Sequence, residues 1–130
     1  MKFEFLEHTA DIKFRAYGHN LNEVFANAGL AMFEAVTDTS TVKQLIRKEF
    51  SLQANDLKSL LYDFLEELLI LHESENLLFS KFTVKIKDNT LRAVAWGEQL
   101  RNHELKCLIK AVTYSEMVIT DKMAQVVLDI

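Results

Sequence analysis

The 130-residue sequence contains no proline, only three glycines and a single cysteine. No stretch has the composition of a flexible or stiff linker, so we predict one domain over residues 1–130. The lone Cys107 has no partner for an internal disulfide, and nothing therefore suggests an oxidising compartment; we expect it to be a small buried hydrophobe. No run approaches the roughly 20 apolar residues that cross a bilayer, and no secretion signal opens the chain. These absences predict a cytoplasmic protein without membrane contact.

An excess of basic residues is missing as well. The chain has 19 acidic and 15 basic side chains, which gives a formal charge of −4. Proteins that bind a nucleic-acid backbone usually carry a basic stripe, so the overall charge argues against direct binding of RNA or DNA. If the protein works in RNA metabolism, we expect it to act through a protein partner.

What the sequence does contain is two helical patterns set among alternating segments. Asn20 with Glu23 has the spacing of a capping box, and apolar residues then repeat at helical intervals up to about residue 38. Asn55 can cap a second helix over 55–75, which carries a wide apolar stripe. Strands are predicted at 3–6, 12–18, 45–54, 81–87, 91–98 and 123–130, with a longer irregular one at 108–120 and a turn at 88–89. The order predicts an α+β fold, with two helices packed on a mixed, mostly antiparallel β-sheet.

Strand parity makes two aspartates candidates for a cation site. Asp11 points the same way as Lys13, opposite to the apolar set of its strand, and Asp129 is likewise opposite to the apolar residues of the last strand. Ile130 adds a free carboxylate. If the first and last strands are neighbours, these acids converge, and either one is protonated or a cation is bound. Oxygen-only ligands favour Ca²⁺ or Mg²⁺, whereas the alternative is a pair of surface acids.

The other polar candidates each have a structural alternative. His8 is either a ligand or general base, or a hydrogen-bonded histidine in a turn. His103 is most simply a solvated loop residue. Lys110 interrupts an otherwise apolar segment, which is unusual, although a lysine can extend to solvent from a sheet edge. Glycine-rich phosphate loops, Cys/His clusters and nucleophile motifs are all missing, so no catalytic residue is predicted.

Several segments, in order along the whole chain, resemble the archease family. They are "EHTADI" at 7–12, "LNEVFANAGLAMFEAVTD" at 21–38, "LLYDFLEELLILHESENLLF" at 60–79, "IKAVTY" at 109–114 and the ending "MAQVVLDI". "HTAD" alone would be a weak signal, but "HTADI", "FLEELL", "KAVTY" and a terminal "DI" together are specific. The resemblance implies a small cytoplasmic α+β protein that serves an RtcB-type RNA ligase.

The resemblance also implies what the protein does for that ligase. RtcB-type enzymes join RNA ends in tRNA splicing and RNA repair, using GTP and a divalent metal, and attach GMP to their own active-site histidine. An archease speeds this guanylylation and supports multiple turnover without a settled reaction of its own. We therefore expect a non-catalytic activator that meets RNA only through the ligase. The alternative is a chaperone-like, protein-binding adaptor without a functional metal site, docking through Glu66 and Glu67 of the second helix.

Residue by residue, the resemblance implies a divalent-cation site, Ca²⁺ or Mg²⁺, at Asp11, Asp129 and the main-chain oxygen of Ile130. It places Lys110 in ligase activation. His8 and Thr9, which lie beside Asp11 in the sequence, are candidates for a supporting layer behind these ligands.

Overall fold

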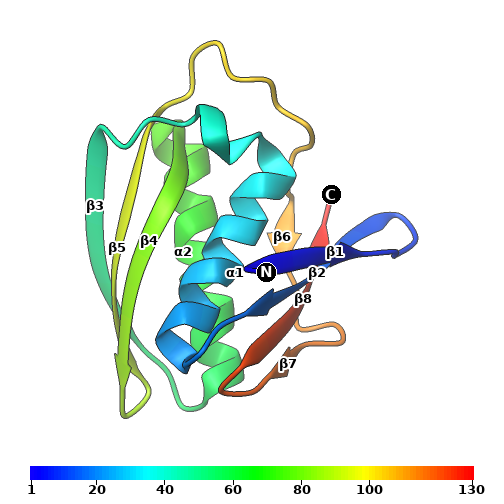
Figure 1. The fold of residues 1–130 in the computed structure, drawn as a ribbon, viewed down its shortest axis with the longest axis vertical. Helices are drawn as coiled ribbons and strands as arrows, with labels where there is room; N and C mark the ends of the chain where they lie inside the picture. Colours follow the sequence, from blue (N-terminus) through cyan, green and yellow to red (C-terminus); the bar gives the residue numbers. More distant parts are fainter.

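The computed structural model describes all residues from 1 to 130, and it contains two helices between two β-sheets (Figure 1). The elements in chain order are β1 (Phe3–Leu6), β2 (Asp11–Tyr17), α1 (Leu21–Val36), the short 3₁₀ helix η1 (Thr39–Thr41), β3 (Ile46–Gln53), α2 (Leu57–Glu75), β4 (Leu77–Lys87), β5 (Thr90–Gln99), β6 (Ala111–Val112), β7 (Val118–Ile119) and β8 (Met123–Asp129). The predicted α+β class is confirmed. Neither helix is long and apolar enough to cross a membrane.

The strands form two separate sheets, in place of the single mixed sheet that we predicted. One sheet has the order β1-β2-β8-β6, with β7 also pairing with β8, and the other has the order β3-β5-β4. Every pairing in both sheets is antiparallel. Alternation shows which residues of a strand face the core, but the number of sheets that share a core is a tertiary property.

The helices and the inner faces of both sheets share one core of 30 buried residues. Its largest fully buried side chains include Phe14 of β2, Phe25 and Phe33 of α1, Phe64 of α2 and Phe79 of β4. Both helices and both sheets therefore contribute large aromatic side chains to the same core, which fixes both sheets against the same pair of helices.

The helix ends follow local capping rules, with one difference from the prediction. Asn20 caps α1 by accepting the backbone N–H of Glu23, as predicted. The cap of α2 is Asp56 rather than Asn55, because the Asp56 carboxylate accepts the N–H of Ser59 at 2.8 Å. Asn and Asp are equally favoured as N-cap residues, so the sequence does not distinguish the two neighbours. The difference moves the start of the helix by one residue.

The region that we predicted as one long strand, 108–120, is two short strands joined by a loop at 113–117. Within this loop Tyr114 stacks on Tyr62 of α2, with ring centroids 4.3 Å apart. The same loop carries Glu116, whose carboxylate contacts His8 and Lys13. By contrast, the predicted turn at Asp88 and Asn89 is confirmed, and both residues have positive φ, as a tight hairpin requires.

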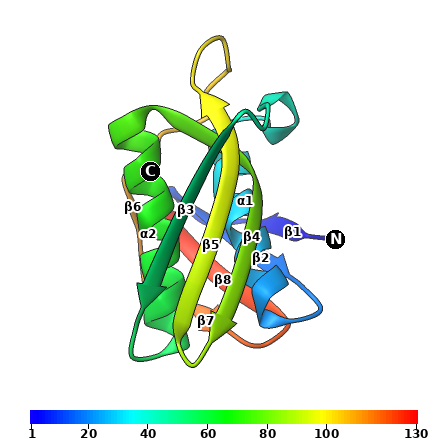
Figure 2. The same cartoon turned by 90° about the vertical axis from the view of Figure 1, so that its left-hand side faces the viewer.

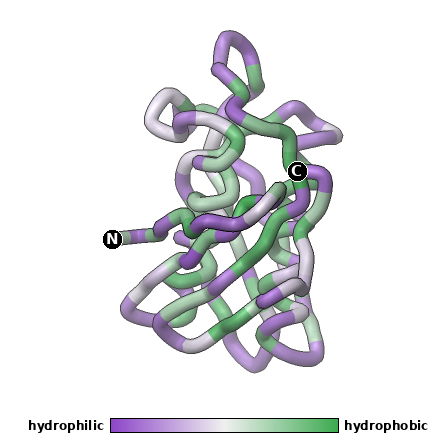
Figure 3. Tube along the Cα trace, turned by 90° about the vertical axis from the view of Figure 1, so that its right-hand side faces the viewer, coloured by the Kyte–Doolittle hydropathy of each residue, from purple (hydrophilic) through white to green (hydrophobic).

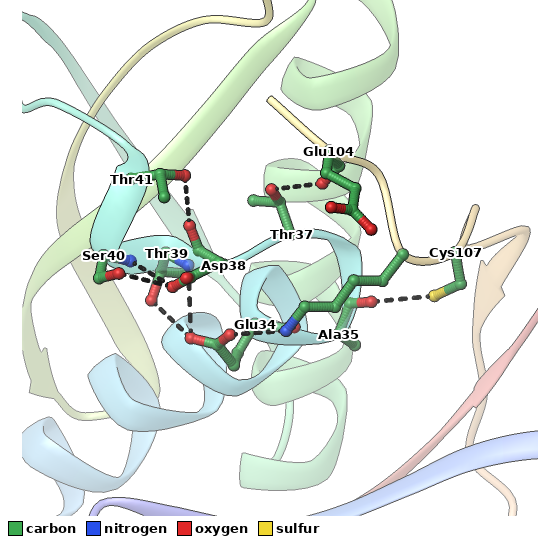
Figure 4. Close-up of polar contacts among 10 residues, drawn as sticks. Glu34, Ala35, Thr37, Asp38, Thr39, Ser40, Thr41, Glu104 and Cys107 are labelled. Atoms are coloured by element: carbon green, nitrogen blue, oxygen red, sulfur yellow. Dashed lines mark hydrogen bonds and ion pairs between the residues drawn. The ribbon is translucent and has the colours of Figure 1, made fainter. Parts of the chain in front are cut away.

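The long connection between β5 and β6 is held against the C-terminal end of α1 (Figure 4). Thr37 donates to the carbonyl of Glu104, and the Cys107 thiol donates to that of Ala35. Cys107 is thus half-buried rather than fully buried, and burial raises its thiol pKa. The prediction of a solvated His103 is wrong, because its side chain is only 9% exposed and lies 3.0 Å from Glu98.

Candidate functional site

Asp11 and Asp129 lie directly opposite each other on adjacent strands. Strands β2 and β8 are antiparallel neighbours, and their register pairs these two residues at the end of the ladder. Residues paired in this way project from the same face of the sheet. Figure 3 views this sheet from outside, with the C-terminus at its upper end. The structure thus confirms the assumption, made in the parity argument, that the strands carrying Asp11 and Asp129 are neighbours.

Lys110 lies on the other side of Asp129, next to β6. Its backbone N–H donates to the Asp129 carbonyl at 2.8 Å, and the following residue, Ala111, pairs with Asp129 in the β6–β8 ladder. Both Lys110 and Ile130 are exposed. One short stretch of sheet thus brings together two carboxylates, the last residue of the chain and the main chain of one exposed lysine.

The donor chemistry of this site fits a hard cation. Asp11 and Asp129 offer carboxylate oxygens, and Ile130 adds main-chain oxygens, which suit Ca²⁺ or Mg²⁺ better than a transition metal. Nowhere in the chain do three His, Cys, Asp or Glu side chains lie close enough together to hold a metal ion. Two side-chain ligands fit a site that completes its coordination with main-chain oxygens, water or atoms of a partner. The cation site stays a prediction.

His8 connects the site to a residue that sequence reasoning missed. Its Nε2 lies 2.7 Å from the Glu116 carboxylate, and its Nδ1 lies 3.5 Å from that of Asp11. Nδ1 is buried and has no hydrogen-bond partner, and the Asp11 carboxylate is the acidic group next to it. Lys13 also donates to Glu116, at 3.2 Å. No sequence signal marks Glu116, because it lies in the loop at 113–117, where the sequence pattern predicts a strand.

The contacts of Glu116 tie the loop between β1 and β2 to the loop between β6 and β7. Besides the ion pairs, the backbone carbonyl of Glu116 accepts a hydrogen bond of 2.7 Å from Gln125 of β8. Asp11 begins β2 immediately after the first of these loops, and Ala10 there has a left-handed backbone, with φ of 64°. A supporting role for His8 beside the predicted ligand Asp11 stays a prediction. Thr9 is exposed on the same loop.

Glu116→Gln is expected to destabilise the protein at neutral pH and to lose this effect in acid. Hydrogen bonds from His8 and then from Lys13 hold the pKa of Glu116 below its usual value. The carboxylate therefore stabilises the fold above the unfolded-state pKa, and this contribution disappears as the pH falls through the folded-state pKa. Urea unfolding of both proteins between about pH 3 and 7 measures the difference. Glu73→Gln, which removes an exposed glutamate of α2, is the control, and a difference independent of pH would contradict the prediction.

The fold and the site together define a small α+β protein whose second and last strands set two aspartates face to face beside a lysine. Comparison with known proteins identifies the family. The model of the archease protein family (MTH1598/TM1083) matches residues 3–130. A protein archease of Sulfurisphaera tokodaii is 51% identical over 125 residues, with 93% of this chain and 90% of that protein covered. One of Methanothermobacter thermautotrophicus is 48% identical, with 98% of each covered. The chain belongs to the archease family.

Solved structures agree with the fold. The solution structure of protein 1598 of Methanobacterium thermoautotrophicum superposes with a TM-score of 0.86 at 46% identity, and 99% of each chain is covered. A crystal structure from Thermotoga maritima, described as an archease and possible chaperone, gives a TM-score of 0.62 at 21% identity, which supports the fold alone. The two-sheet arrangement is thus shared with experimentally determined relatives.

Proposed function

We propose that this archease activates an RtcB-type RNA ligase in tRNA splicing and RNA repair. In this proposal it raises the rate at which the ligase takes GMP from GTP onto its own histidine, and it allows each ligase molecule to turn over repeatedly. The observation that carries the proposal is the cross-strand pair of Asp11 and Asp129, with Lys110 bonded through its main chain to Asp129.

The electrostatics of this pair give the site its role. Like charges directly opposite each other across two strands are unfavourable, so Asp11 and Asp129 attract a cation to the end of the sheet. Together with the main chain of Ile130 they would hold Ca²⁺ or Mg²⁺. When bound, such an ion supplies positive charge for the oxygens of a phosphoryl group. The exposed ammonium of Lys110 offers a second positive charge to a phosphate or to an acidic surface of the ligase.

The residues behind the site keep its geometry. His8 and Lys13 hold Glu116, and through it the loop that precedes Asp11 stays fixed to the sheet. A carboxylate that is already oriented binds its ion without the entropic cost of ordering a loop.

Transfer of labelled GMP from GTP onto the ligase, without RNA, tests the proposal. The ligase is in excess and this protein is present in trace amounts, so that only a factor acting repeatedly raises the rate. Lys110→Glu is expected to abolish the stimulation, because it replaces the positive charge with a negative one. Lys87→Glu makes the same change of charge on the opposite sheet and should stimulate like the unaltered protein. A cognate ligase that shows no stimulation would contradict the proposal.

The absence of stimulation would favour the adaptor alternative, in which the acids of α2 dock a protein partner. Glu66 and Glu67 lie on the partly accessible side of that helix. Reversal of both charges should then abolish capture of the ligase, whereas Asp11→Asn should leave it unchanged.

A further inference from the structure

We propose that the outer face of the β3-β5-β4 sheet binds a single strand of RNA. This inference rests on the sheet itself and does not depend on activation of a ligase. Figure 2 views the sheet from outside, and no helix or loop crosses in front of it, whereas its inner face packs on α1 and α2. The part of the face between Trp96 and Thr90 is therefore available to a partner, whereas Glu98 at the other end of β5 is covered by contacts with Lys43 and His103.

The register of the three strands collects basic side chains on this face. Arg47 and Lys81 flank Trp96 in one row, and Arg92 lies between Ser51 and Lys85 in another. The charged residues that share the face are Arg47, Lys81, Lys85, Lys87, Arg92, Glu49 and Glu98. Five are basic and two are acidic, although the whole chain has a net charge of −4. The net charge of the whole chain argued against a nucleic-acid binder, but a sum over all residues does not reveal a local basic surface.

The two acids neutralise only part of the surface. Glu98 lies at one end of the face, is only 14% exposed and contacts the backbone N–H of Lys43 and the side chain of His103. Glu49 lies 3.0 Å from the guanidinium of Arg47 and 3.6 Å from that of Arg92, so it orients both arginines. The three lysines of β4 take part in none of the ten salt bridges of the protein. Lys85 and Lys87 are two residues apart on one face, which spaces them by about 7 Å along the strand. A row of unpaired ammonium groups of this kind can follow a phosphate backbone.

Trp96 distinguishes this surface from a purely electrostatic one. It is the only tryptophan of the chain and stands half-exposed in the central strand, with the Lys81 ammonium 4.8 Å from its ring centroid. An indole within a basic surface stacks on any base, and the flexible Lys81 can then move to a neighbouring phosphate. An acidic protein partner would form ion pairs with the basic side chains but would have no base to stack on the Trp96 ring.

Hydroxyl groups between the charges favour RNA over DNA. Thr83, Ser51 and Thr90 project from the same face, and their side chains are exposed. A depression of about 330 Å³ includes Thr83, Lys85 and Arg92 in its lining. Hydroxyl side chains beside cations can hydrogen-bond the ribose 2′-OH, which is the group that separates RNA from DNA.

The first experiment titrates the protein alone with a labelled oligouridylate of about 12 nucleotides, a length suited to one binding surface. The anisotropy of the RNA should rise at protein concentrations between about 1 and 100 µM, and the fluorescence of Trp96 should be quenched in parallel. Three phosphate contacts predict that the logarithm of the binding constant falls with that of salt concentration with a slope of about −2, or about 15-fold from about 50 to 200 mM. No anisotropy change at about 100 µM protein in low salt would overturn the proposal.

Charge variants test the location. Lys85→Glu with Lys87→Glu should weaken binding by about tenfold or more and bring the salt slope closer to zero. Glu49→Gln should strengthen binding, a gain that a folding defect cannot produce. Lys2→Glu, a lysine of the N-terminal end outside this face, makes the same change of charge as one of the pair and should have no effect. Equal weakening by Lys2→Glu and by Lys85→Glu would overturn the assignment.

Two further arms test the identity of the ligand. Trp96→Leu should weaken RNA binding several-fold while leaving the salt slope unchanged, because it removes stacking but no charge. Polyglutamate should cause no quenching of Trp96, and oligodeoxyuridylate should bind more weakly than the RNA. Stronger binding of polyglutamate would favour an acidic protein partner, and equal binding of the DNA strand would overturn the choice of RNA. These assays contain no ligase, and the GMP-transfer assay contains no RNA. A negative result for RNA binding is therefore independent of the result of the GMP-transfer test.

Discussion

Replacing Gly97 by alanine is expected to destabilise the protein by about 3 kcal/mol or more. Gly97 lies in β5 at the bulge of the neighbouring strand β4, where the register shifts between Phe79 and Lys81. A Cβ atom at this glycine would stand 1.7 Å from the carbonyl oxygen of Leu78 and 2.8 Å from the Cα of Phe79. Both obstacles are backbone, so relief requires the two strands to separate at a fully buried part of the core.

Gly29→Ala is the matched control for this substitution. Its Cβ would lie 3.3 Å from side-chain atoms of Leu68 and Phe82, which can give way by a few tenths of an ångström. Alanine also favours a helix interior over glycine by about 1 kcal/mol, so the net change should be close to zero. Urea unfolding measures both variants. Equal destabilisation by the two would contradict the distinction between backbone and side-chain obstacles.

Gly97 is also an example of a structural requirement that the sequence pattern does not predict. Its place in an alternating strand predicts only a buried, inward-facing position, and the need for glycine arises from a bulge in the next strand. The helices and the main strands could be predicted, because capping residues and apolar periodicity are local. The division into two sheets and the break within 108–120 could not, since both depend on which distant segments share a face.

The candidate site likewise contains residues that the sequence could predict and a residue that it could not. Parity and the resemblance to archeases selected Asp11, Asp129 and Lys110. The strand register sets the two aspartates opposite each other, and the backbone of Lys110 is hydrogen-bonded to Asp129. Glu116 could not be selected, because its contacts come from a loop that folds back over the sheet more than 100 positions from His8. The basic face of the second sheet was equally hidden, because its cations come from three strands and a whole-chain charge cancels them.

Neutralising either aspartate of the pair is expected to change stability in opposite directions with and without divalent ions. In a chelator, Asp11→Asn and Asp129→Asn should each stabilise the protein by about 0.2–1 kcal/mol, because they relieve a repulsion between residues that the register sets directly opposite each other. With Ca²⁺ or Mg²⁺ at about 100 times its dissociation constant, the unaltered protein should gain about 2.7 kcal/mol, whereas the variants should gain much less. The order of stabilities should therefore reverse.

Thermal unfolding in EDTA and across a series of Ca²⁺ and Mg²⁺ concentrations measures this reversal, with Asp121→Asn as the control. Asp121 is highly exposed in the turn before β8, and its loss should change neither series. In the GMP-transfer assay, the variants that fail to gain stability from the ion should also fail to stimulate the ligase. Full stimulation by Asp11→Asn would separate activation from the cation and leave Lys110 to act alone. Loss of stimulation without any ion-dependent stabilisation of the unaltered protein would mean that the two carboxylates act only once the ligase completes the site.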